Sequence, residues 1–268
     1  MKISIVTPCR NSVKTIERTI KSVVEQSSNV TELEYIIVDG QSDDGTLDII
    51  KRYADEYSFI KYISEKDHSM TEALNKGFKL ATGDIIASIN ADDIYLPDTL
   101  RKVKHAFEEN DHPNIVLINT FFVDAESGRI KSKNTPKKFS PMICGFIECP
   151  FPECAIFFRK NVVKETGLFN EKMKYTQDFE YYLRAYDKGF RFSYYDIDGS
   201  CFYISSSNYS SIIGDKMRDE ALTYFNHKWT YKYISGSWIS KIIKEIFGFR
   251  HYYIGKNSQI RIQDVRKS

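Results

Sequence analysis

Residues 81–93 read ATGDIIASINADD. Its apolar run, residues 85–89, contains one serine and leads directly into two adjacent acids, Asp92 and Asp93. A short, continuous apolar run predicts a strand that is buried on both faces of a sheet. The glycine of the stretch follows a helical pattern at residues 69–81, as a residue that ends a helix does. We therefore predict a helix, a buried strand and an acidic turn, in that order.

The alternation of helix and strand continues on both sides of this stretch. Apolar runs predict strands at residues 3–7, 35–38, 60–64, 85–89, 115–123, 128–133, 154–159, 190–197 and 201–205. Helical patterns lie at residues 12–26, 46–57, 69–81 and 177–188, and a further helix is expected to begin at Pro97. Buried strands that alternate with helices predict an α/β fold with a mixed, mainly parallel sheet flanked by helices.

The composition excludes several classes of protein. With 268 residues, 42% of them hydrophobic and 28% charged, the chain is long and apolar enough for a globular core and is not disordered. The net charge of +2 argues against a dedicated nucleic-acid-binding protein. The N-terminal apolar stretch ends at Pro8, too early for a signal peptide, and an odd number of cysteines, five, suits free thiols. We expect a cytoplasmic protein.

Polar and acidic residues follow four of the predicted strands. They are Thr7, Pro8, Asp39, Asp67, Asp92 and Asp93. The carboxyl ends of parallel strands meet at one edge of a sheet, which is where such folds bind ligands. Adjacent carboxylates can hold a hard divalent cation such as Mg²⁺ or Mn²⁺. The alternative for Asp92 and Asp93 is a helix-capping acid with a solvated neighbour, but acids gathered at one edge repel one another without a cation.

Three motifs in this order resemble those of the family 2 glycosyltransferases. They are TPCRN at residues 7–11, VDGQSDDGT at residues 38–46, and ATGD at residues 81–84 leading to NADD at residues 90–93. The resemblance covers roughly residues 1–205. It implies the GT-A fold, a nucleotide-sugar donor (a UDP-sugar foremost), a divalent metal cofactor (Mn²⁺ or Mg²⁺), and inverting transfer to a hydroxyl of a glycan or lipid-linked acceptor in surface polysaccharide synthesis.

The resemblance also implies roles for individual residues. The nucleotide-sugar-binding residues would be Thr7, Pro8, Arg10, Asp39, Asp67, Asn75, Asn90, Ala91 and Asp92. Asp92 and Asp93 would hold the metal. Residues 90–92 stand in place of the family's Asp-x-Asp motif, and the chain departs from it because the first acid is Asn90.

Asp178 is the expected catalytic residue. Residues 177–178, Gln-Asp, match the family's Glu-Asp motif, in which the aspartate is the general base. An inverting transfer needs a carboxylate that takes the proton of the acceptor hydroxyl. From the residues alone, Asp178 could instead be an acid favoured by the dipole at a helix start, and Glu180 is a competing acid. His68 could contact the donor phosphate or be an exposed loop histidine, and Glu153 could face the acceptor.

Two other functions are compatible with an α/β fold that carries acids on its strand ends. A sugar-nucleotide nucleotidyltransferase would usually have a glycine-rich loop after the first strand, and residues 8–11 contain no glycine. A non-catalytic nucleotide-binding assembly subunit would have lost the acids, whereas Asp92, Asp93 and Asp178 are present.

The charge of the chain is unevenly distributed. Residues 227–268 contain nine lysine and arginine residues and two acids, a net charge of +7, and residues 1–226 carry −5. Residues 238–249 have the pattern of a basic amphipathic helix. We expect a catalytic domain over residues 1–226 and a C-terminal helical extension over residues 227–268. The extension would contact an anionic membrane at its inner face, pack on the catalytic domain, or form a homodimer contact.

Overall fold

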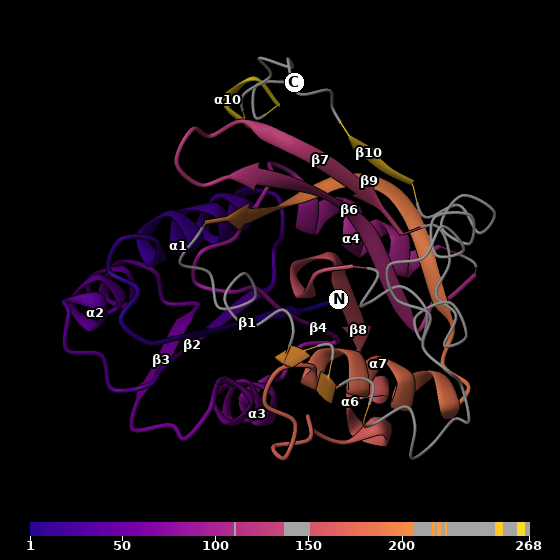
Figure 1. Cartoon of the computed structure of the whole chain (residues 1–268), viewed down its shortest axis with the longest axis horizontal. Coiled ribbons are helices and arrows are strands. Elements are labelled where there is room, and N and C mark those ends of the chain that lie inside the picture. The colour runs from indigo at the N-terminus through magenta and orange to yellow at the C-terminus, as the bar shows by residue number, and fades with distance from the viewer. Residues whose placement is uncertain are drawn as a thin grey trace.

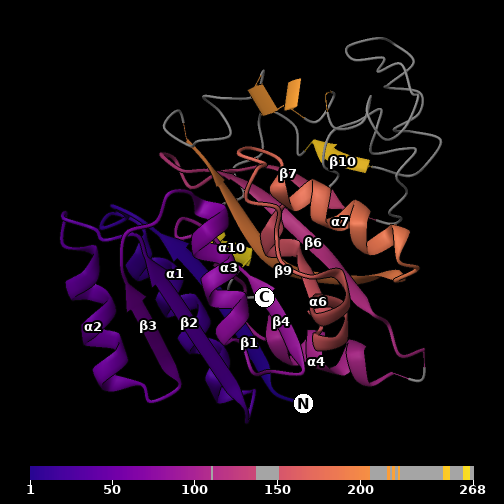
Figure 2. The ribbon, with the colours of Figure 1, turned by 90° about the horizontal axis from the view of Figure 1, so that it is seen from below.

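The computed structural model describes residues 1–109, 111–136 and 151–205, with the short segments 216–217, 219–220, 223, 250–253 and 262–265. The described strands form one 10-stranded sheet. Helices pack on both faces of this sheet, as Figures 1 and 2 show in two perpendicular views. Within the described part of the chain, no helix combines the length and the apolar character needed to cross a bilayer.

The first half of the sheet is parallel, as predicted. Its strands are β1 (Ile3–Cys9), β2 (Leu33–Asp39), β3 (Ile60–Ser64) and β4 (Ile85–Ser88), in the order β4-β1-β2-β3. The connecting elements are α1 (Ile16–Val24), the 3-10 segment η1 (Glu25–Ser28), α2 (Thr46–Glu56) and α3 (Met70–Leu80). Helices α1 and α2 cover one face and α3 covers the other (Figure 1). All four carboxyl ends therefore meet at one edge.

The second half of the sheet is mostly antiparallel. Its strands are β5 (Ile94–Tyr95), β6 (Ile115–Asp124), β7 (Ile130–Thr135), β8 (Ile156–Arg159), β9 (Phe192–Ile204) and β10 (Arg250–Tyr253). Its helical elements are α4 (Thr99–Glu108), η2 (Glu153–Ala155), α6 (Lys160–Thr166), α7 (Gln177–Asp187) and α10 (Ile262–Val265). The order β10-β7-β6-β8-β4 is antiparallel at each step, and β9 runs parallel to β6. The predicted mixed α/β fold is confirmed.

Two sequence-based predictions of elements were wrong. The strands expected at residues 190–197 and 201–205 form the single strand β9. Gly199 lies inside β9 and does not interrupt it; a glycine is needed there because a Cβ would come within 2.4 Å of the Ile118 side chain. The helix expected from residue 12 begins only at Ile16, since residues 12–15 form a separate turn.

The described parts of the predicted C-terminal extension contact the main body of the protein. Strand β10 pairs with β7, and Ile262 of α10 is buried in one cluster with Val123 and Ile130. The amphipathic helix predicted at residues 238–249 lies outside the described residues.

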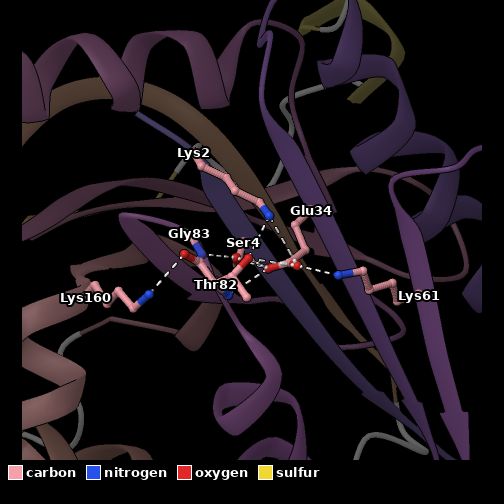
Figure 3. Close-up of polar contacts among 7 residues, drawn as sticks. All are labelled: Lys2, Ser4, Glu34, Lys61, Thr82, Gly83 and Lys160. Carbon is pink, nitrogen blue, oxygen red and sulfur yellow. Dashed lines mark hydrogen bonds and ion pairs between the residues drawn. The ribbon is translucent and has the colours of Figure 1, made fainter.

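Glu34 joins the amino ends of the four parallel strands (Figure 3). Its carboxylate is 2% exposed and accepts hydrogen bonds from Ser4 Oγ at 2.6 Å, from the Thr82 amide at 2.8 Å and from Lys61 Nζ at 2.9 Å. Ser4 Oγ in turn accepts a hydrogen bond from the Gly83 amide at 2.8 Å. Burial alone would raise the pKa of Glu34, but these donors outweigh it and lower the pKa to about 2.

We expect Glu34→Gln to destabilise the fold in a pH-dependent way. Because the pKa of Glu34 is lower in the folded protein than its ordinary value of 4.5, its contribution is fully present above pH 4.5 and is lost as the pH falls toward 2. Urea denaturation should show a loss of about 3 kcal/mol at pH 7 that shrinks steadily below pH 4.5. The control is Glu32→Gln, an exposed acid just before β2. A loss for Glu34→Gln that is equal at pH 7 and pH 3 would contradict this role.

Candidate active site

The turn that follows β4 is fixed by contacts to two other elements. Asp93 is 1% exposed, and its Oδ1 accepts the amide of Tyr203 in β9 at 3.1 Å. Helix α1 holds the backbone of the same turn, because Arg18 Nη2 donates to the Asp92 carbonyl and Thr19 Oγ1 donates to the Asp93 carbonyl, both at 2.7 Å. The Arg18 guanidinium also lies 3.6 Å from the centre of the Tyr203 ring. The two acids are therefore held in place before any ligand binds.

This turn leaves buried oxygen atoms without donors. Asp93 Oδ2 and Asn90 Oδ1 have no hydrogen-bond partner among the described residues. Burial raises the pKa of Asp93 well above its ordinary value, and the charge of Asp92 raises it further. Burial likewise raises the pKa of Asp92, whose side chain is only partly exposed. Buried oxygens of this kind are stabilised by a cation or a ligand donor.

Glu153 brings a third carboxylate to the end of β4. It lies in η2, is 6% exposed, and its Oε1 accepts a hydrogen bond from Ser88 Oγ at 2.5 Å. Burial raises its pKa to about 7 despite that hydrogen bond, and the charge of Asp178 contributes. The charge of Glu153 in turn raises the pKa of Asp93. Asp93, Glu153 and Asp178 therefore interact electrostatically, although they come from separate parts of the chain.

Asp178 lies in the first turn of α7 and is half-buried. Burial raises its pKa to about 6, although its Oδ1 accepts the Phe179 amide at 2.8 Å, and the charge of Glu220 raises the pKa further. The helix is anchored by aromatic contacts: the ring of Tyr182 lies 5.1 Å from that of Phe151, centre to centre. An acid with a pKa of about 6 is ionised at neutral pH and is still basic enough to take a proton.

Asp39 orders the turn that follows β2. It is fully buried, and its two oxygens accept hydrogen bonds from Ser42 Oγ at 2.5 Å, from the Ser42 amide at 3.1 Å and from Ser64 Oγ at 2.7 Å. A side chain at the adjacent Gly40 would crowd Asp67, because a Cβ there would lie 3.3 Å from Asp67 Oδ2. The missing side chain lets Asp67 come close to the backbone of this turn.

Asp67 presents one unpaired oxygen at the same place. It is 8% exposed, and its Oδ1 binds Lys76 Nζ at 2.5 Å, whereas its Oδ2 has no hydrogen-bond partner within the described ranges. The side chain of Arg10 flanks the same position, since a Cβ on Gly40 would also be 3.4 Å from Arg10 Cβ. An acceptor, a cation and bare backbone thus lie together at the ends of β1, β2 and β3.

The remaining predicted residues belong to the same segments or to neighbouring ones. Thr7 and Pro8 are buried in β1, and Thr7 Oγ1 is 3.0 Å from the Tyr35 hydroxyl. Ala91 is buried in the acidic turn. His68 is exposed, and its Nδ1 lies 2.8 Å from Glu72 Oε2.

Asn75 connects α3 to the loop before α7. It is 2% exposed on α3, donates to the Phe169 carbonyl at 3.0 Å and to Glu171 Oε1 at 2.8 Å, and accepts the Phe169 amide at 2.9 Å. Both its amide hydrogens and its oxygen are engaged within the protein, so its observed contacts tie α3 to the loop before α7.

Three contributors were not foreseen from the sequence. Arg18, Ser88 and Tyr203 hold the acidic residues, yet each occurs singly in an ordinary helix or strand pattern. Ser88 alone carried a signal, as the one polar residue in the run IIASI.

The sequence profile of the family described as "Glycosyl transferase family 2" matches residues 4–167. The chain belongs to this family. It is 30% identical over 194 residues to the putative glycosyltransferase EpsE of Bacillus subtilis, a match that spans 71% of this chain and 68% of EpsE. It spans about half the length of several other curated relatives that it matches.

Solved glycosyltransferases share the fold. Staphylococcus aureus TarS 1–349 in complex with UDP-GlcNAc superposes with a TM-score of 0.64 at 23% identity, over 84% of this chain and 67% of that one. The mannosyltransferase PcManGT of Pyrobaculum calidifontis, in complex with GDP-Man and Mn²⁺, superposes with a TM-score of 0.63 at 18% identity, over 86% and 65%. The fold of this chain is therefore the GT-A fold, as the motifs predict.

The acidic turn suits a divalent metal that is shared with a substrate. Among the described residues, no three acidic, histidine or cysteine side chains gather as a complete ligand set. Mg²⁺ and Mn²⁺ commonly take only one or two protein carboxylates and complete their shell with water and substrate phosphate oxygens. The partly exposed Asp92 and the unpaired oxygens of Asn90 and Asp93 are hard donors of the required kind.

Proposed function

We propose that this glycosyltransferase moves a sugar from a UDP-sugar to a hydroxyl of a glycan or lipid-linked acceptor, with inversion, in the synthesis of a surface polysaccharide. The observation that carries the proposal is the position of Glu153: Ser88 holds it at the end of β4, beside the acidic turn, and its pKa responds to the charge of Asp178. A base and a diphosphate-binding turn must lie on either side of the reacting carbon. The UDP-GlcNAc bound by TarS supports a uridine donor.

The nucleotide would bind at the ends of β1, β2 and β3. Asp67 Oδ2 is a buried acceptor without a donor among the described residues, and the N–H of a uracil ring would supply one. Arg10, which is exposed and lies beside Gly40, can reach a phosphate or the ribose. Asp39 would contribute indirectly, because its hydrogen bonds with Ser42 and Ser64 fix the turn that contains Gly40. Asn75 would support this site without touching the donor.

The diphosphate would lie at the acidic turn. Asp92, with Asn90 or Asp93 beside it, would hold Mn²⁺ or Mg²⁺, and the bound ion would neutralise the charge of the leaving diphosphate. Arg18 and Thr19 keep the carbonyls of this turn fixed, so the carboxylates need little rearrangement when the donor arrives.

Asp178 would act as the general base. Its carboxylate takes the proton of the acceptor hydroxyl, the hydroxyl oxygen forms a bond to the anomeric carbon, and the bond from that carbon to the diphosphate breaks in the same step. Burial and the charge of Asp178 raise the pKa of Glu153, so an ionised Asp178 favours the protonated form of Glu153. Because the acids of the site are retained, a non-catalytic binding subunit is the weaker alternative.

The basic C-terminal segment suggests where the enzyme works. Residues 227–268 carry a net charge of +7, and the pattern at residues 238–249 is that of an interfacial helix. We propose peripheral contact with an anionic membrane, where a lipid-linked acceptor would be found.

We expect the two key acids to fail in different ways. Asp178→Asn should lower kcat for UDP-sugar hydrolysis or transfer at least about a hundredfold, since general-base catalysis supplies a factor of that order, and should leave UDP binding unchanged. Asp92→Ala should weaken Mn²⁺-dependent UDP binding about tenfold or more. Calorimetry measures UDP binding, and a UDP-release assay measures kcat. The control is Asp187→Asn, at the far end of α7. Full activity of Asp178→Asn would refute its role as the base.

Membrane contact should depend on the lysines of the C-terminal segment. Each lysine near an anionic surface contributes about 1 kcal/mol, so replacing Lys241 and Lys244 together by glutamine should weaken vesicle binding about thirtyfold. Co-sedimentation with phosphatidylglycerol vesicles measures this in the full chain. The control exchanges the exposed Lys160 and Lys164 of α6. Negligible binding by the unmodified protein would refute the contact.

A further inference from the structure

Glu220, which follows β9 in the chain and precedes the basic C-terminal segment, binds the turn that precedes α7. Its Oε1 accepts the Lys174 amide at 2.8 Å, and its Oε2 accepts the Tyr175 and Thr176 amides, both at 2.9 Å, and Thr176 Oγ1 at 3.0 Å. One carboxylate therefore binds three consecutive backbone N–H groups and a hydroxyl. In Figure 1 a short helical piece that follows β9 in the chain, drawn in orange, lies beside the start of α7.

These amides need a partner from elsewhere in the chain. Thr176 is the N-cap residue of α7, so its amide has no acceptor within the helix, and its own side chain makes no capping hydrogen bond. Lys174 and Tyr175 lie in the turn before the helix, and their amides also bind Glu220. Glu220 supplies the acceptor from a position 44 residues later. A negative charge at this end is also favoured by the helix dipole.

The contact lies two residues from Asp178. The loop before α7 is held at its start by Asn75, which binds Phe169 and Glu171, and at its end by Glu220. The backbone that carries Asp178 therefore lies between a fixed loop and a fixed helix. The charged groups that face Asp178 from neighbouring elements, among the described residues, are Glu153 and Glu220.

We infer that Glu220 is a positioning residue for catalysis: it fixes the first turn of α7 so that Asp178 faces the acceptor. The inference rests on the proposed role of Asp178 as the base. It makes the stretch of chain that follows β9, at the end of the predicted catalytic domain, part of the active site. The rest of α7 does not depend on this contact, because Tyr181 and Tyr182 pack on Phe158 and Phe169.

The test compares three variants in the full chain. Glu220→Ala removes every hydrogen bond, Glu220→Gln keeps an acceptor oxygen but removes the charge, and Asp219→Asn alters the exposed neighbour as a control. We expect Glu220→Ala to lower kcat between about tenfold and a hundredfold with KM for the donor unchanged, as small displacements of catalytic groups do. Glu220→Gln should lose less. Its acid limb in the pH dependence of kcat should move to lower pH, because the pKa of Asp178 falls when the neighbouring charge is removed.

Hydrogen exchange provides a readout that does not depend on activity. The amides of Lys174, Tyr175 and Thr176 should exchange slowly in the unmodified protein and in Asp219→Asn, and rapidly in Glu220→Ala. Equal exchange in all three proteins would overturn the contact. Altered exchange with a kcat within twofold of the unmodified protein would overturn the positioning role. An unmodified protein that turns over no UDP-sugar would refute the proposed function. Hydrogen exchange would still test whether Glu220 binds the amides of residues 174–176.

Discussion

The carboxylates at the carboxyl edge of the sheet repel one another, and the site is built around this repulsion. Burial is the first cause of each raised pKa. The charge of Asp92 then acts on Asp93, that of Asp178 acts on Glu153, and that of Glu220 acts on Asp178. Burying acids that oppose one another is unfavourable for folding alone. We attribute the arrangement to the proposed reaction, which needs one carboxylate beside a cation and another beside a proton donor.

The rest of the fold holds these acids against their repulsion. Arg18 and Thr19 grip the acidic turn from α1, Ser88 binds Glu153, and Glu220 secures the turn before α7. The opposite edge of the parallel strands has the reverse character. There Glu34 has donors on every side, and its pKa is lowered to about 2. At the amino ends of the parallel strands, the carboxylate of Glu34 is fully hydrogen-bonded and stabilises the fold. At their carboxyl ends, buried oxygen atoms of Asp67 and Asp93 have no donor among the described residues and are available to ligands.

The parts of this structure that depend on local pattern were predictable from the sequence. The continuous apolar runs of β1 to β4 identify buried parallel strands, and their carboxyl ends locate Asp39, Asp67 and Asp92 at one edge. Features that depend on packing were not predictable. Gly199 looks like a break between two predicted strands, but it lies inside β9, where close packing against Ile118 requires a residue without a side chain.

The same limit applies within the site. The raised pKa of Glu153 follows from burial and from a neighbour 25 residues later, and the contacts of Asn75 and Glu220 join segments that no local motif connects. A resemblance assigns roles to residues that stand in motifs, and it carries no information about the residues that hold them.

We propose that the acidic turn binds a divalent ion together with the diphosphate of a nucleotide. The decisive measurement is a calorimetric titration of UDP into the metal-free protein, with and without Mn²⁺. UDP should bind at least about tenfold more tightly in the presence of Mn²⁺, because the ion would relieve the repulsion among the carboxylates and ligate the phosphates. UDP affinity that is the same with Mn²⁺ and with a chelator would contradict it.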